Sequence, residues 1–306
     1  MPESAAEAGR GRRVAVVTGA TGGIGIHVAA GLVAAGHQVL VTGRDQTGGE
    51  TAVRFLRRQA PGGQARFLAA DHLTVGGNLR AAGRVAELTD RVDVLVNNVG
   101  GLFPERVTTA DGLEATLALN FVAAAALTGR LLPLLSAAPA ARCVNVVSSA
   151  FQMARGDPFA EPAGRYVGID AYARAKLLAV LWTCQLAADT TTASNRALAG
   201  AFCANPGMAW TPNVRQLTRQ AVPAWRVSWP VVRWMQRRAS PARAARSPLH
   251  AATAPLEALA AGPYVDERCR ARPIGQRLPD DGPRRAHDLA QRLIDEAPTG
   301  RPGSSA

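Results

Sequence analysis

A tyrosine and a lysine four residues apart, Tyr172 and Lys176, suggest proton-transfer chemistry. Lys176 is the one lysine among 35 basic residues, the other 34 being arginines. An ammonium is a compact point charge and a guanidinium a flat fork, so an arginine-rich chain is expected to keep a lysine where an amine is needed. Residues i and i+4 share a helix face, and a nearby cation favours ionisation of a phenol, whose ordinary pKa is about 10. The pair therefore predicts a tyrosine that acts as a general acid and base, although the lysine count alone also allows an ordinary surface lysine.

A glycine-rich segment, residues 19–25, lies where a dinucleotide cofactor would bind. Residues 13–18 form an apolar run that predicts a buried parallel strand. Residues 24–35 predict an amphipathic, alanine-rich helix that stops at Gly36. Glycines between a strand and a helix let the backbone approach a pyrophosphate, and the helix N-terminus offers it free N–H groups. The candidate contacts in this loop are Gly19, Thr21, Gly23, Ile24 and Gly25.

The end of the second expected strand, residues 38–42, bears on the choice between NAD and NADP. An acidic residue near this point grips the ribose 2′-OH of NAD, whereas an arginine suits the 2′-phosphate of NADP. Gly43 removes bulk here and Arg44 supplies a guanidinium, so NADP is favoured. Asp45 is expected to cap the following helix, over about residues 46–59.

Two further cofactor contacts are expected after a third strand at residues 65–69. Asp71 stands where a loop would lie over the adenine. His72, beside it, is expected to form a wall of the adenine pocket rather than to act as a catalyst.

Polar residues also end the next two expected strands, at residues 92–96 and 142–147. Open α/β sheets bind their ligands at the carboxyl ends of such strands. Asn98 and Gly100 follow the first of them, and the serine pair Ser148 and Ser149 ends the second, at the edge where a ligand is expected.

Asn120 lies among Ala, Leu and Val in a helix expected over about residues 109–135. A buried amide costs free energy unless it is hydrogen-bonded. Asn120 is therefore either a satisfied core amide or part of a buried relay.

The remaining pattern completes one fold class. Helices are expected at residues 78–90 and 170–188, and a sixth strand at 196–203, followed by Pro206, Gly207 and Thr211. Strands that alternate with helices predict an α/β protein with one doubly wound, mainly parallel sheet of about seven strands and helices on both faces. We expect a single Rossmann-type domain at 13–297, between a disordered lead at 1–12 and a disordered tail at 298–306.

Composition narrows the functional classes. Hydrophobic residues make up 47% of the 306 residues, which is ample for a core. The four cysteines form no C-x-x-C pair and are expected to be reduced, and the five histidines show no metal-ligand spacing. No signal peptide and no apolar run of about 18 residues is recognised, so a cytoplasmic protein is expected. The net charge is +12, but no nucleic-acid motif accompanies it, so no nucleic-acid partner is predicted.

Taken together, these residues resemble the short-chain dehydrogenase/reductase family over roughly residues 13–275. The matching segments, in the family's order, are Thr18-Gly19…Gly23-x-Gly25, Asp71, Asn97-Asn98-x-Gly100, Asn120, Ser149, Tyr172-x-x-x-Lys176 and Pro206-Gly207…Thr211. Val99 and His72 depart from the usual alanine and aliphatic residue. The long interval between Ser149 and Tyr172 is similar to the retinol-dehydrogenase-like and protochlorophyllide-reductase-like branch.

This resemblance implies a role for each member of a catalytic tetrad. Tyr172 would be the general acid/base, and Lys176 would lower its pKa and hold the nicotinamide ribose. Ser149, preferred to Ser148, would bind the substrate oxygen, and Asn120 would hold a water that links Lys176 to solvent. Members of the family commonly dimerise through the two long helices near 109–135 and 170–188, so a homo-oligomer, dimer or tetramer, is expected.

One stretch, residues 208–246, lies where the family places a substrate lid. It contains four of the five tryptophans, Trp210, Trp225, Trp229 and Trp234, and eight arginines between Arg215 and Arg246. The alternatives are a helix that packs on the core, an aromatic pocket for a bulky apolar substrate, and an interfacial membrane contact, of which the last is the least expected.

We therefore expect an NADP(H)-dependent oxidoreductase that interconverts a hydrophobic alcohol and its ketone or aldehyde, without a metal. The alanine- and arginine-rich composition is associated with GC-rich bacterial genomes and suggests tailoring of secondary metabolites. Two alternatives stay open: a non-redox cyclisation or dehydration at the same site, and a non-catalytic dinucleotide sensor.

Overall fold

The structure, a computed structural model, describes residues 12–161, 164–191, 198–209, 234, 238–274 and 278–298. Its centre is one eight-stranded sheet in the order β3-β2-β1-β4-β5-β6-β7-β8. All neighbouring strands are parallel except β7 and β8, which pair antiparallel. The predicted α/β class and doubly wound parallel sheet are thus confirmed. The short antiparallel β8 at the edge adds one strand to the expected number.

The first half of the chain alternates strands and helices as predicted. The elements are β1 Val14–Val17, α1 Gly23–Ala34, β2 Gln38–Gly43, α2 Gln46–Arg57, β3 Gln64–Ala69, α3 Val75–Ala86 and β4 Val94–Asn97. Helix α3 begins three residues earlier than expected, because the Thr74 side chain accepts a hydrogen bond from the Gly77 N–H (3.1 Å) and caps it. Because these strands are parallel, their carboxyl ends meet at one edge of the sheet. The glycine loop lies at that edge, between β1 and α1.

The expected long helix over 109–135 is shorter and interrupted. It consists of α4 Ala115–Leu117, a π-helical turn Ala118–Val122 and α5 Ala123–Ser136. The Asn120 Nδ2 donates to the Thr116 carbonyl four residues earlier, at 2.7 Å. This side chain thus shares an acceptor that a regular α-helix would use for its backbone, which is one identifiable reason for the local irregularity.

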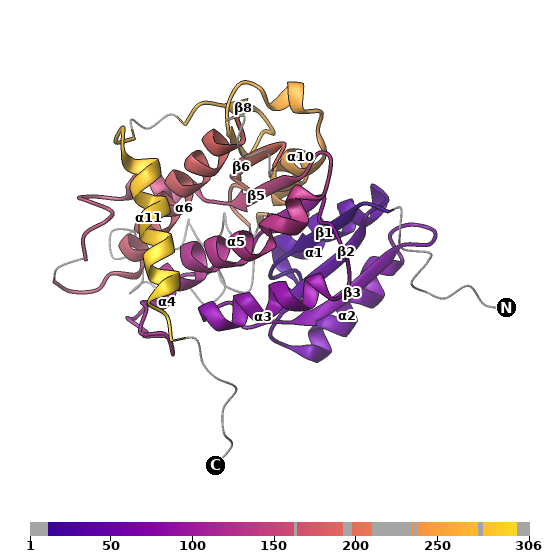
Figure 1. Cartoon of the computed structure of the whole chain (residues 1–306), viewed down its shortest axis with the longest axis horizontal. Coiled ribbons are helices and arrows are strands. Elements are labelled where there is room, and N and C mark those ends of the chain that lie inside the picture. Colours follow the sequence, from indigo (N-terminus) through magenta and orange to yellow (C-terminus); the bar gives the residue numbers. More distant parts are fainter. Residues whose placement is uncertain are drawn as a thin grey trace, which may run out of the picture.

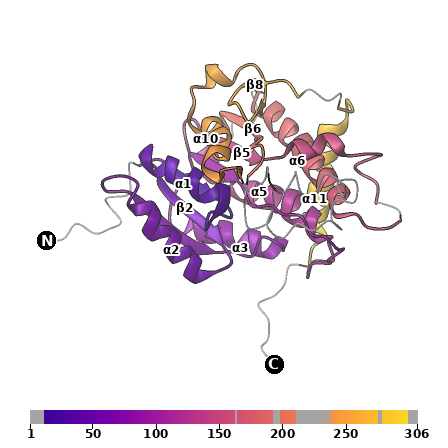
Figure 2. The same ribbon diagram turned by 180° about the vertical axis from the view of Figure 1, so that it is seen from behind.

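The second half supplies the remaining strands and the helix that carries the tyrosine–lysine pair. The elements are β5 Arg142–Val146, a 3-10 turn Ser149–Met153, α6 Gly168–Thr191, β6 Gly200–Ala204, α9 Pro241–Ala244, α10 Arg246–Thr253, a 3-10 turn Leu256–Leu259, β7 Tyr264–Val265, β8 Ala271–Arg272 and α11 Gly282–Asp295. Helices α1 and α10 pack on one face of the sheet. Helices α3, α5 and α6 cover the other face, and Figures 1 and 2 show the two sides.

Helix α11 forms an additional layer outside α6 (Figure 1). Its buried residues Ala286 and Ala290 belong to the same hydrophobic cluster as Leu178 and Leu181 of α6. A Cβ at Gly282 would lie 3.0 Å from the Leu181 side chain. The outer face of α6 is therefore covered within this chain, at the surface through which a dimer had been expected.

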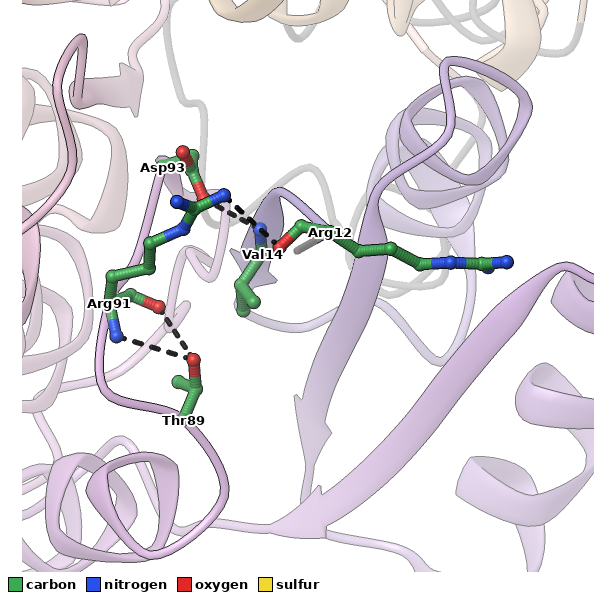
Figure 3. A network of polar contacts seen from close by, with 5 residues as sticks. All are labelled: Arg12, Val14, Thr89, Arg91 and Asp93. Atoms are coloured by element: carbon green, nitrogen blue, oxygen red, sulfur yellow. Dashed lines mark hydrogen bonds and ion pairs between the residues drawn. The ribbon is translucent and has the colours of Figure 1, made fainter. Parts of the chain in front are cut away.

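A polar network ties β1 to β4 at the edge opposite the strand carboxyl ends (Figure 3). The Asp93 Oδ2 accepts from the Val14 N–H at 2.8 Å and pairs with the Arg91 Nε at 3.3 Å. Arg91 also donates to the Arg12 carbonyl, and Thr89 bonds to both the N–H and the carbonyl of Arg91. Because the network fixes the start of β1, it holds the strand whose far end leads into the glycine loop.

One helical stretch, Ala115–Ser136, has 22 residues and a mean hydropathy of 1.6, and is apolar enough by length and composition to cross a membrane. The expectation that the sequence holds no such stretch is therefore wrong. In this fold 67% of its most apolar window is buried, because it packs between the sheet and α3, α6 and α11.

The four cysteines are free, as expected, with Cys143 and Cys203 buried.

Candidate active site

The glycine loop leaves room beside the N-terminus of α1. Gly19 and Gly23 adopt φ angles of +61° and +58°, which residues with a side chain rarely adopt. No side chain caps the helix at Gly22, and a Cβ placed there would meet nothing within 4 Å. A helix N-terminus with this open space fits the pyrophosphate of a dinucleotide. Thr21 and Ile24 lie in the same segment, and Thr21 is exposed.

Asn98 holds the loop from the neighbouring strand. Its Nδ2 donates to the carbonyls of Thr18 (2.8 Å) and Gly19 (3.2 Å). The Thr18 hydroxyl accepts in return from the N–H groups of Asn98 and Val99, each at 2.9 Å. A Cβ at Gly25 would lie 2.5 Å from the Asn98 Nδ2. Asn98 and Gly25 thus shape the loop, and the Asn98 amide is engaged with protein carbonyls.

The residues at the end of β2 fit a site in which an arginine favours NADP over NAD. Arg44 is exposed directly after Gly43. A Cβ at Gly43 would lie 2.7 Å from the Thr21 side chain, so the glycine keeps the space between strand end and loop. The Asp45 carboxylate accepts from the N–H groups of Thr47 (3.3 Å) and Gly48 (2.7 Å). Asp45 therefore caps α2 as predicted, and its carboxylate is engaged there.

His72, expected to form a wall of the adenine pocket, is buried with both its ring nitrogens engaged by protein groups. It is 4% exposed, and its Nδ1 lies 2.6 Å from the Asn78 Oδ1 while its Nε2 lies 2.7 Å from the Thr42 hydroxyl. The Asn78 Nδ2 donates to the Thr74 carbonyl, so Oδ1 accepts from Nδ1–H and Thr42 donates to Nε2. Burial lowers the pKa of His72, consistent with this neutral form. The imidazole thus anchors the loop that carries Asp71, which is itself exposed.

Lys176 is buried and directed at the end of β5. It is 3% exposed, and its Nζ donates to the Val146 carbonyl at 2.9 Å. The same Nζ lies 5.7 Å from the centroid of the Tyr172 ring, so the pair shares a helix face as predicted. Burial lowers the pKa of Lys176 to about 8. An amine in this setting titrates much nearer to neutrality than a surface lysine does.

Burial has the largest effect on the pKa of the Tyr172 phenol. Burial raises its pKa to about 12, and a hydrogen bond with Ser148 lowers it in part. We expected a lowered pKa from the nearby ammonium; that expectation is wrong here, since the desolvation cost dominates and Lys176 directs its amine to Val146.

Ser148 lies close enough to Tyr172 to lower the pKa of its phenol. Ser149, the serine preferred from the sequence, is exposed on the first position of a 3-10 turn, and its role toward the substrate oxygen stays a prediction. Ser148 ends the extended segment and caps that turn, accepting from the Ala150 N–H at 3.3 Å. Sequence spacing could not separate adjacent serines, because the sharp turn after β5 decides which of them faces α6.

Asn120 lies beside Lys176 across a glycine. Its Nδ2 donates to the carbonyls of Gly101 and Thr116, each at 2.7 Å, and its Oδ1 accepts from the Gly101 N–H at 3.2 Å. A Cβ at Gly100 would lie 2.8 Å from the Asn120 Oδ1 and 3.2 Å from the Lys176 Nζ. The glycine therefore allows the amide and the amine to approach the same small space. Asn120 is satisfied as a core amide and is also placed for a relay.

Residues after β6 complete the edge only in part. Gly207 has a φ of +70°, and its N–H donates to the Asn205 Oδ1 at 3.1 Å, next to Pro206. Thr211, Trp210, Trp225 and Trp229 lie outside the described residues. Of the expected lid, Trp234 is 55% exposed with Arg238 stacked at 3.9 Å, whereas Ala244 and Ala245 are buried. The end of that segment thus belongs to the core.

Sequence reasoning missed Tyr166, which joins the loop before α6 to the helix that carries Asn120. Its hydroxyl lies within 3.2 Å of Phe103, Glu114 and Thr116. The chain has only three tyrosines, and two of them, Tyr166 and Tyr172, flank the start of α6. That placement is the signal that could have drawn attention to Tyr166. Among the described residues, no group of three or more His, Cys, Asp or Glu could hold a metal ion.

Comparison with known proteins agrees with this geometry. A family model described as "short chain dehydrogenase" matches residues 13–220. Mouse (Mus musculus) polyprenol dehydrogenase is 32% identical over 274 residues, covering 86% of this chain and 78% of that protein. Human (Homo sapiens) retinol dehydrogenase 12 is 35% identical over 179 residues, covering 57% and 56%. The 3-oxoacyl-(acyl-carrier-protein) reductase of Agrobacterium tumefaciens, solved with NADP bound, has a TM-score of 0.60 and 25% identity over 79% of this chain and 87% of that one.

A parallel doubly wound sheet with a glycine loop after β1 and a Tyr–Lys helix beside it defines a nicotinamide-dependent oxidoreductase. The chain belongs to the short-chain dehydrogenase family. Within that family it falls with the retinol-dehydrogenase-like branch.

Proposed function

We propose that this enzyme interconverts a hydrophobic alcohol and its aldehyde or ketone with NADP(H). The observation that carries the proposal is the cluster at the carboxyl edge of the sheet. There Tyr172 lies near Ser148 and shares a helix face with buried Lys176, and a single strand, β4, separates β5 from the strand that leads into the glycine loop. NADP is chosen because Arg44 is exposed, Asp45 is engaged as a cap, and the solved reductase relative holds NADP.

The residues divide the work of proton transfer. When bound, the nicotinamide supplies or accepts the hydride. Ser148 and Tyr172 are placed to hold one substrate oxygen, to which the phenol donates its proton in the reducing direction. Lys176, whose Nζ lies 5.7 Å from the centroid of the Tyr172 ring, stabilises the phenolate that remains. The space beside Gly100, between Asn120 and Lys176, is where we place a bridging water for proton exchange with solvent.

An apolar substrate fits the loops around this edge. Val107, Met153 and Met208 follow β4, β5 and β6 and are 43%, 39% and 50% exposed. With Trp234 they make four of the five large exposed hydrophobic residues in the described part of the chain. Long isoprenoid alcohols, as the name of the mouse relative implies, are one such class, and bulky polycyclic secondary metabolites are another.

The test is cofactor turnover by the purified chain, followed by nicotinamide absorbance. We expect NADPH oxidation with long-chain or polycyclic carbonyl compounds in detergent, and little with short water-soluble ketones.

Tyr172→Phe should abolish turnover while NADP⁺ still binds. Arg44→Ala should weaken NADPH by about 10-fold and NADH little, as expected for one charged contact. Product formation without a change in absorbance would instead favour the non-redox alternative, and binding without any turnover would favour a sensor.

The oligomeric state is proposed to differ from the sequence expectation. Helix α11 already covers α6, so pairing through α6 would require its displacement. We propose that the full chain does not dimerise through this surface. Light scattering during gel filtration should give the mass of one chain, and a dimer that cross-links through α6 would contradict the proposal.

A cytoplasmic location is retained as a proposal, to be tested by fractionation.

A further inference from the structure

Tyr166 joins three segments of the chain that each carry part of the site. Its hydroxyl lies 3.2 Å from the Phe103 carbonyl, 3.1 Å from the Glu114 Oε1 and 3.0 Å from the Thr116 hydroxyl. Phe103 lies in the loop after β4, which also carries Gly100 and Gly101. Tyr166 itself is two residues before α6, on which Tyr172 lies in the second turn.

Glu114 and Thr116 continue these contacts to Asn120. The Glu114 carboxylate caps α4 by accepting from the N–H groups of Thr116 (2.7 Å) and Leu117 (2.9 Å), and its Oε1 also accepts from Tyr166. The Thr116 carbonyl accepts from the Asn120 Nδ2 at 2.7 Å. The phenol therefore binds both the cap of this helix and the residue that holds the Asn120 amide.

The start of α6 is packed tightly at the same junction. A Cβ at Gly168 would lie 2.5 Å from the Phe103 carbonyl oxygen and 3.0 Å from the Leu102 side chain. Close packing of this kind transmits displacement, because it leaves no free volume to absorb it. A shift of the loop at Tyr166 would thus move the first turns of α6 relative to Asn120.

We propose that Tyr166 is a positioning residue that sets Asn120 and the Tyr172–Lys176 helix in register with each other. This inference rests on the proposed function, since Asn120, Tyr172 and Lys176 carry the chemistry there. The hydroxyl stays protonated at neutral pH, because burial raises the pKa of Tyr166 to about 12 and the Glu114 charge adds to that shift. It can therefore donate to the carboxylate throughout the working range.

The test compares Tyr166→Phe with wild type in the full chain. A misplacement of catalytic groups by less than 1 Å is expected to lower kcat by about 10-fold, while the Kd for NADP⁺ stays within about twofold because the glycine loop is untouched. Hydrogen–deuterium exchange should quicken in two separate segments, around residues 114–122 and 164–176.

Thr116 offers the conservative rescue. Thr116→Ser keeps the hydroxyl and should retain kcat, whereas the near-isosteric Thr116→Val should lose about as much as Tyr166→Phe. The double variant Tyr166→Phe/Thr116→Val should lose little more than either single one, since groups in one network are not additive. The matched control is Thr89→Val, which removes a hydroxyl with two backbone bonds at the opposite edge of the sheet (Figure 3) and should leave kcat unchanged.

Three results would overturn the inference: a normal kcat in Tyr166→Phe, a change confined to the substrate KM, or faster exchange in only one of the two segments. If wild type itself shows no turnover, the proposed function fails. Hydrogen exchange still decides in that case, because unchanged exchange in either segment rejects the coupling and faster exchange in both supports the register that Tyr166 sets.

Discussion

At the scale of single residues, the two adjacent serines give the sharpest contrast. Ser148 meets the Tyr172 phenol, whereas Ser149 is exposed on the following turn. A hydroxyl that stabilises developing charge on a substrate oxygen contributes about 10²–10³ in kcat. We expect Ser148→Ala to lose activity on that scale and Ser149→Ala to stay within about threefold of wild type. Steady-state kinetics with a saturating carbonyl substrate checks this, and equal losses in the two variants would reject the assignment of Ser148.

Lys176 bears on the stability of the chain as well as on the proposed chemistry. It is 3% exposed, and its pKa is lowered from 10.5 to about 8 by burial. Below pH 8 the amine is protonated in both the folded and the unfolded chain, so the burial cost is fully present. Between about pH 8 and 10.5 only the unfolded chain holds the proton, and stability rises with pH across that window.

Replacing Lys176 by methionine removes this cost together with the catalytic amine. We expect Lys176→Met to abolish turnover and to raise the free energy of unfolding at pH 7 by roughly 1–3 kcal/mol. The advantage should shrink as pH rises from about 8 to 10.5. Urea unfolding at several pH values measures it, and a variant less stable than wild type at pH 7 would show that the Nζ bond to Val146 outweighs the desolvation.

At the scale of elements, local sequence patterns predicted most of the strands and helices. They failed where a contact with a residue distant in the sequence determines the direction of a side chain. The strands and glycine loop follow from apolar runs and punctuation, as at residues 13–25. The Asn120 amide also binds the Gly101 carbonyl, a contact across 19 residues that no local pattern near 120 reveals. His72 likewise faces inward because Asn78 and Thr42 bind both its nitrogens. Residue types therefore located the site, whereas side-chain direction within it came from tertiary contacts.

Helix α11 offers a prediction at this scale. Its Ala290 is 2% exposed against α6, whereas His287 faces solvent. Ala290→Glu places a charge in an apolar contact and should destabilise the chain by about 2–4 kcal/mol, with self-association as the α6 face is uncovered. His287→Glu introduces the same glutamate side chain about one turn away from Ala290, on the exposed face. It should change the free energy of unfolding by less than about 0.5 kcal/mol. Urea titration and light scattering measure both effects, and equal stability in the two variants would mean that α11 is not held on α6.

At the scale of the whole molecule, the sheet separates stability from chemistry by its two edges. Asp93 fixes the start of β1 and Ser148 follows the end of β5, on opposite sides of the core. The four residues of β1 alone span about 13 Å at a rise near 3.3 Å per residue. The network around Asp93 (Figure 3) touches no residue of the proposed site.

Asp93→Ala removes the acceptor of the Val14 N–H and the ion-pair partner of the Arg91 Nε, while the Arg91 Nη2 keeps the Arg12 carbonyl. Because Asp93 is 8% exposed, the loss should cost about 2 kcal/mol of folding free energy. The rigid strand between the edges should keep kcat and the Kd for NADP⁺ within about twofold of wild type, measured well below the melting temperature. Ser148→Ala should show the reverse, with an unchanged melting temperature and a large loss of kcat. A fall in kcat for Asp93→Ala comparable to that of Ser148→Ala would mean that β1 transmits strain from one edge to the glycine loop, and that the two functions are not separable.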